Sequence, residues 1–151
     1  MTNDKQTAQT YLEGRAMQKA MRRAVDAAKV LASQGEAMIR AGAAKYAEGS
    51  QLLVDAITLE EAISASTTLH HEVKAMLAKV ATLRKAGRRL RMLGGLDKSA
   101  GGCIVRNAER QRKLAVRGEL EATRQVAGSS GAPRRGRKPD LGFSHLLDDE
   151  S

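Results

Sequence analysis

The chain has 151 residues, which suits one domain with appendages, and only 2% are aromatic, so few large side chains exist to fill a rounded core. A single cysteine excludes an internal disulfide framework and a cysteine-cluster metal site. No apolar run approaches the roughly 20 residues that cross a bilayer, and the polar N-terminus is unlike a signal peptide. We therefore expect a cytoplasmic, all-α protein that avoids membranes: an elongated helical hairpin or coiled-coil-like bundle, assembled into a homo-oligomer.

The net charge of +9 is concentrated in one part of the chain. Residues 1–78 contain nine basic and nine acidic side chains, and residues 118–151 contain five basic and six acidic ones. Residues 79–117 contain twelve basic side chains against Asp97 and Glu109, a net charge of +10. This placement is typical of a surface that binds a polyanion.

The first predicted helix covers about residues 4–34. Its apolar residues recur at alternating spacings of four and three, as in a coiled coil or a close helical hairpin: Met17, Met21, Ala24, Ala28 and Leu31. Gly35 is predicted to end this helix. Gly42 and Gly49 continue the same phase, and a glycine inside a helix costs about 1 kcal/mol. We expect tight packing or breaks there, and a weak, interrupted helix over residues 36–48.

Ser50 is predicted to restart a helix, and Thr58 with Glu61 fits a capping box. A strand over residues 52–59 is an alternative, although no other segment could pair with it. The strongest apolar stripe predicts a helix to about residue 92, and its members are Leu69, Val73, Met76, Val80, Leu83, Gly87 and Leu90.

Two glycine pairs follow this helix. Gly94-Gly95 is predicted to end it, and Gly101-Gly102 to close a loop before a last helix over about residues 103–127. Residues 1–127 then form the helical region, which carries oligomerisation and the basic block. Residues 128–151 form a disordered tail that starts with a flexible linker rich in glycine and serine.

Residue types used in catalysis are scarce. His70, His71 and Glu72 are neighbours, but histidines that share a metal on a helix need a spacing of four residues. No histidine is placed to activate Cys103, and the glycine pairs lack the spacing of a phosphate-binding loop. We expect no enzyme, no metal site and no cofactor.

The basic block predicts contacts with the phosphates of double-stranded DNA. Arg84, Arg88 and Arg91 share one helical face, and Lys85 and Arg89 lie beside them. A solvated face or an acidic protein partner is the alternative. Single-stranded binding is disfavoured because no aromatic platform exists for stacking bases. Further cations of the block belong to the last predicted helix: Arg106, Arg110, Arg112, Lys113 and Arg117.

Both prolines of the chain lie in the C-terminal tail, on either side of Arg134-Arg135-Gly136-Arg137-Lys138. An Arg-Gly-Arg tripeptide flanked by prolines resembles the AT-hook, and it is similar to the tripeptide of H-NS-type bacterial nucleoid proteins. The resemblance implies that Arg135, Gly136 and Arg137 enter the minor groove of A·T-rich DNA, where a glycine lets the backbone approach the groove floor. Arg134 and Lys138 would flank this core.

The chain ends with apolar residues beside acidic ones. Ser144 could cap a short turn that presents Leu141, Phe143, Leu146 and Leu147 ahead of three acidic residues. Such a segment can dock on a protein partner. An inert tail, or one whose acids fold back on the basic block, remains an alternative.

These features predict a small, non-enzymatic DNA-binding protein, nucleoid-associated or a phage- or plasmid-type regulator, with weak A·T-biased specificity. The alternative is a helical scaffold or adaptor, similar in texture to phasins, the low-aromatic helical proteins that coat polyester granules. A coat protein has no need for a charge of +10 within 39 residues. Charge placement therefore favours the DNA-binding hypothesis.

Overall fold

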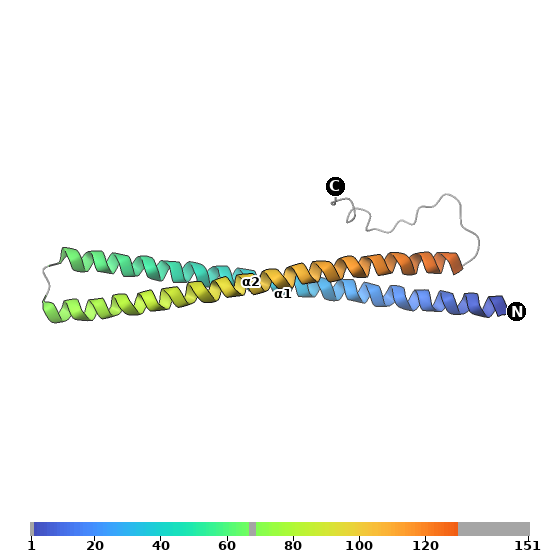
Figure 1. Ribbon diagram of the computed structural model, residues 1–151, viewed down its shortest axis with the longest axis horizontal. Coiled ribbons are helices and arrows are strands. Elements are labelled where there is room, and N and C mark those ends of the chain that lie inside the picture. The colour runs from blue at the N-terminus through green and yellow to red at the C-terminus, as the bar shows by residue number, and fades with distance from the viewer. Residues whose placement is uncertain (1, 67–68, 130–151) are drawn as a thin grey trace, which may run out of the picture. The chain divides into compact units, whose positions relative to one another are not determined.

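The described residues form two α-helices, α1 (Thr2–Ala65) and α2 (His70–Ser129) (Figure 1). The computed structural model describes residues 2–66 and 69–129, and no strand occurs among these residues. At the connection, the Ser66 amide donates to the Ile63 carbonyl (3.3 Å), and the Glu72 amide donates to the Leu69 carbonyl (3.0 Å). The prediction of an all-α helical hairpin is confirmed.

The chain is divided into two compact units. One comprises Arg22–Val116, and the other joins the described residues up to Met21 with those from Arg117 to Ser129. Within each unit, α1 and α2 pack against each other in antiparallel directions, because contacts move down α2 as they move up α1.

In the unit Arg22–Val116, three glycines of α1 face three glycines of α2. Gly35 lies opposite Gly101, Gly42 opposite Gly94, and Gly49 opposite Gly87. A Cβ on Gly94 would lie 2.4 Å from the Gly42 carbonyl oxygen, and a Cβ on Gly49 would lie 2.6 Å from the Gly87 carbonyl oxygen. The two backbones are therefore too close for any side chain at these positions.

This close approach explains why the helices run through their glycines. Each glycine lowers helix propensity by about 1 kcal/mol, but here it brings Cα–H groups against carbonyl oxygens of the facing helix, a contact that recurs at helix interfaces. Packing therefore overrides local propensity. Of the two readings of the glycine repeat, tight packing is the right one, and the predicted breaks are wrong.

Several predicted boundaries are wrong for the same reason. Gly35 does not end a helix, residues 36–48 are not interrupted, and residue 50 does not start a new helix, since all lie inside α1. Gly94-Gly95 and Gly101-Gly102 likewise lie inside α2, where a helix end and a loop were expected.

One alternative and two smaller predictions also fail. Residues 52–59 are helical and not a strand, and Thr58 is no cap, because its hydroxyl donates to the Val54 carbonyl (3.0 Å) within α1. Gly128 belongs to α2, so the helix extends past residue 127 into the predicted linker. Residues 130–151, which hold the rest of the predicted linker and tail, lie outside the described residues.

In the second unit, glycines again lie in the interface between α1 and α2, but each faces a larger side chain of the other helix. A Cβ on Gly14 would lie 2.8 Å from a methyl of Val126, and one on Gly118 would lie 2.7 Å from the Met21 sulfur. Gln18 donates to the Thr123 hydroxyl (3.2 Å) across this interface. Glu119 is a buried charged side chain of this unit.

The core consists of small side chains, as the scarcity of aromatic residues predicts. Its buried apolar members are Val25, Ala28, Ala56, Val80, Ala108, Ala115, Val116 and Ala122. Ala28, Val80 and Gly87 from the predicted stripes lie in the interface, whereas Met17, Leu69 and Met76 are exposed. The stripes therefore identify the correct helical phase but not the extent of burial.

Candidate nucleic-acid interface

The packing of α2 on α1 defines which face of α2 points away from its partner. Interface residues of α2 recur every seven positions, at Val80, Gly87, Gly94, Gly101 and Ala108. Positions two and five residues after each of these lie on the opposite side, because the helix turns once every 3.6 residues. We call this set the outward stripe; it is Thr82, Lys85, Arg89, Met92, Leu96, Ser99, Cys103, Arg106, Arg110 and Lys113, and every member is exposed.

The outward stripe carries five cations and no acid. The cations form two groups, Lys85 with Arg89 near one end and Arg106, Arg110 and Lys113 near the other. Like charges three and four residues apart on a helix repel each other. No position of the stripe holds an acid, although the exposed Glu109 lies next to Arg110 and four residues before Lys113. An external polyanion would relieve the repulsion.

Uncharged residues separate the two groups. Met92 and Leu96 are 60% and 59% exposed and lie on the stripe between Arg89 and Arg106. Cys103 is also exposed there and accepts a hydrogen bond from the Arg106 guanidinium (3.2 Å). The stripe therefore has a neutral, partly apolar middle.

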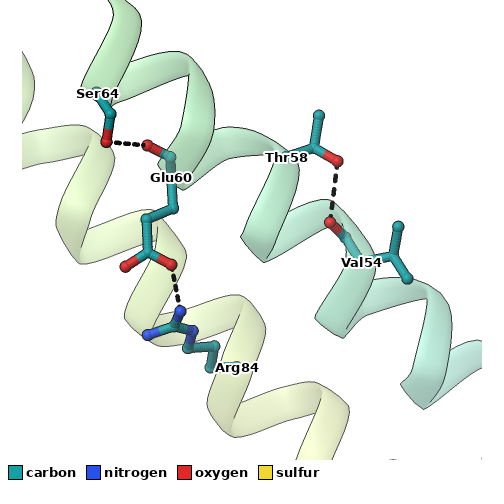
Figure 2. A network of polar contacts seen from close by, with 5 residues as sticks. All are labelled: Val54, Thr58, Glu60, Ser64 and Arg84. Carbon is teal, nitrogen blue, oxygen red and sulfur yellow. Dashed lines mark hydrogen bonds and ion pairs between the residues drawn. The ribbon is translucent and has the colours of Figure 1, made fainter.

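Arg84, predicted to contact phosphates, is held by the facing helix. Its guanidinium forms an ion pair with the Glu60 carboxylate of α1, as Figure 2 shows. Glu60 is positioned by α1, where its carbonyl accepts from the Ser64 hydroxyl (3.1 Å). Leu77, Val80 and Lys85 line a shallow hollow beside this pair. Arg84 thus ties α2 to α1 and is not a member of the outward stripe.

Tyr46 of α1 holds two more cations of the block. The Arg91 guanidinium lies 4.7 Å from the centre of its ring and also donates to its hydroxyl, and the Lys98 ammonium lies 5.8 Å from the ring centre. Next to them, Lys45 of α1 pairs with Asp97 of α2 (2.6 Å). Arg91 therefore also faces α1.

The remaining predicted cations divide between the units. Arg88 is exposed next to Arg89, and Arg112 is half-buried at the side of α2. Arg117 is exposed and belongs to the unit that also holds the start of α1. Of the predicted set, the structure brings Lys85, Arg88 and Arg89 together, and separately Arg106, Arg110 and Lys113.

Histidine is a residue type of catalytic and metal sites, and two histidines are neighbours in α2. His70 and His71 are exposed at the start of α2. Over residues 2–66 and 69–129, no group of three or more His, Cys, Asp or Glu side chains could hold a metal ion. Neither of the two described helices combines the length and the apolar character that a membrane-crossing segment needs.

The predicted minor-groove motif, Arg134 to Lys138, and the predicted docking residues Leu141, Phe143, Leu146 and Leu147 lie outside the described residues. They stay predictions from the sequence.

In comparisons with known proteins, no family model, no curated protein and no solved structure matches this chain.

Sequence reasoning missed the partners of the basic block. Glu60 and Tyr46 were not singled out, and without them Arg84 and Arg91 looked available to a ligand. The signal lay in the glycines spaced by seven on both helices, Gly35, Gly42 and Gly49 and then Gly87, Gly94 and Gly101. Taken as one facing pair of repeats, they would have separated the cations that face α1 from those that point outward.

Proposed function

We propose that the outward stripe of α2 binds the phosphate backbone of double-stranded DNA without catalysis and with little sequence preference. The observation that carries this proposal is a single exposed helix face with five cations and no acid. Phosphate contacts of this kind supply most of the affinity of non-specific DNA binding. We propose in addition that the protein is located in the bacterial cytosol or nucleoid, where it would meet DNA.

The outward face of α1 has no comparable excess of positive charge, so the excess is specific to α2. The corresponding positions of α1, two and five residues from its interface residues, carry Arg23 and Arg40 against Asp26 and Glu61. All four are exposed, and their charges cancel. A charge that served solubility alone would not be confined to one of two packed helices.

Binding to duplex is favoured over binding to single strands because the ring of Tyr46, beside the basic block, is already in contact with two cations. Single-strand binding proteins stack bases on exposed aromatic rings. The ring of Tyr46 already has Arg91 and Lys98 against it. The outward stripe itself consists of cations, aliphatic side chains, two hydroxyls and a thiol.

The test is the salt dependence of duplex binding by a charge-matched pair of variants. Arg89→Ala, Arg106→Ala and Arg110→Ala together remove three cations of the stripe, and the slope of log affinity against log salt should fall by about two to three. Arg23→Ala, Lys29→Ala and Arg40→Ala remove the same charge from exposed positions of α1 and should leave the slope nearly unchanged. Equal effects of the two triple variants would contradict the proposal.

The tail adds the expected A·T bias. Arg135, Gly136 and Arg137 would lie in the minor groove, where readout distinguishes little beyond A·T from G·C pairs. Affinity from the stripe and preference from the tail are then separable by mutation.

A second candidate function is supported by the apolar middle of the stripe. Met92 and Leu96 expose more than half of their surface between two cationic groups. A helical scaffold that coats an anionic or apolar particle would use such side chains. Replacement of both by Ser should abolish binding to a particle surface but leave the salt slope of DNA binding intact.

A further inference from the structure

The two cationic groups of α2 repeat with a fixed spacing. Lys85 and Arg89 are followed 21 residues later by Arg106 and Arg110. Since 21 residues are three of the seven-residue repeats that set the packing on α1, both pairs point away from α1 in the same sense. At about 1.5 Å per residue, the pairs are separated by about 32 Å along the helix.

This spacing is close to one turn of a DNA duplex. Along one side of B-form DNA, the same strand returns after about 34–36 Å. A helix lying along the duplex would therefore bring each cationic group to a passage of the same phosphate strand. The side chains of Arg and Lys are long enough to accommodate the small difference.

We infer that both cationic groups bind one duplex at the same time, with α2 lying along the duplex axis rather than across it. One group is Lys85 and Arg89 of the outward stripe together with the exposed Arg88 beside them, and the other is Arg106, Arg110 and Lys113. The inference rests on the proposed DNA binding by the outward stripe and specifies its geometry. The alternative arrangement, in which α2 crosses the duplex, would use only one group for each duplex.

A variant with unchanged composition tests this geometry. Three exchanges between neighbours, Arg106→Asn with Asn107→Arg, Arg110→Gln with Gln111→Arg, and Lys113→Leu with Leu114→Lys, rotate the second group by about 100° around α2. Positions 107, 111 and 114 are exposed, so charge and helix length stay the same. The matched control, Arg110→Lys with Lys113→Arg, keeps both charges on the outward stripe.

Binding to a 20-base-pair duplex is measured against salt. Six phosphate contacts give a slope of about five, and three contacts give a slope of about three. The control should keep the slope of the unaltered protein, and the rotated variant should drop to about three with its helical circular dichroism unchanged. An equal slope for the rotated variant would overturn the inference and leave the proposed DNA binding standing.

A second measurement needs no variant. The unaltered protein on a 6-base-pair G·C-rich duplex, about 20 Å long at about 3.4 Å per base pair, can engage only one group, because the nearest cations of the two groups, Arg89 and Arg106, lie about 26 Å apart along the helix. Its slope should be about three, against about five on 20 base pairs. The same slope on both lengths would overturn the inference. If the protein binds vesicles of phosphatidylserine and phosphatidylcholine but no duplex, both the inference and the proposed function are wrong.

Discussion

Adjacent glycines in α2 provide a sharp test of the close packing between the helices. Gly94 faces α1, whereas Gly95 has no atom within 4 Å of the position that a Cβ would occupy. Replacement of either residue by Ala adds the same methyl group to the same helix. The two variants therefore share the gain in helix propensity, which is about 1 kcal/mol, and differ only in packing.

The packing term follows from what the new methyl group would meet. At Gly94, the Cβ would lie 2.4 Å from the Gly42 carbonyl oxygen and 2.7 Å from the Tyr46 amide nitrogen. Both are backbone atoms, so no side chain can rotate away and the helices must separate locally. Such overpacking typically costs about 1–3 kcal/mol. Gly95→Ala should raise the free energy of unfolding by about 1 kcal/mol. The free energy of unfolding of Gly94→Ala should be about 1–3 kcal/mol lower than that of Gly95→Ala.

The assay is urea or thermal unfolding followed by circular dichroism, with all variants at one protein concentration. In a chain of this size, about 1 kcal/mol corresponds to a shift of about 2–4 °C in the unfolding midpoint. Gly102→Ala serves as a second control, because its Cβ would meet only the Arg106 side chain, at 3.5 Å. If Gly94→Ala stabilises the protein as much as Gly95→Ala, the glycine faces are not in contact and the account of the fold is refuted.

Three further predictions concern the contacts of Tyr46 with the basic block, the C-terminal tail and the oligomeric state. Tyr46→Leu removes the ring that holds Arg91 and Lys98 and should lower the free energy of unfolding by about 1 kcal/mol; Tyr11→Leu is the control, and equal losses would show that the ring contacts contribute nothing. Gly136→Leu keeps every charge but blocks a close approach of the tail to the groove floor, so gel shifts should show weaker binding to A·T-rich duplex and little change on G·C-rich duplex. A silent Gly136→Leu would mean that the tail acts only through its charge. Sedimentation at micromolar concentration should show a dimer or larger species, since the helices bury few large side chains, and a monomer would contradict the expected oligomer.

The amino-acid sequence by itself determined the all-α class and the phase of the helices. Apolar and small residues at spacings of three and four identified the buried face around Ala28, Val80 and Gly87, because this periodicity is a local property of a helix. The charge of +10 over residues 79–117 also followed from composition alone. Both conclusions need no knowledge of which segments meet.

Only the tertiary structure decided that the helices are continuous. A glycine in isolation favours a helix end, and its cost is recovered only when another backbone packs against it, as Gly42 and Gly94 do for each other. The same pairing decided the roles of the cations. Arg84 and Arg91 look like phosphate ligands on an isolated helix, but Glu60 and Tyr46 lie 24 and 45 residues away in the chain and meet them only across the interface. Which cations point outward is therefore a property of the helix pair, set by the small residues that let two backbones come together.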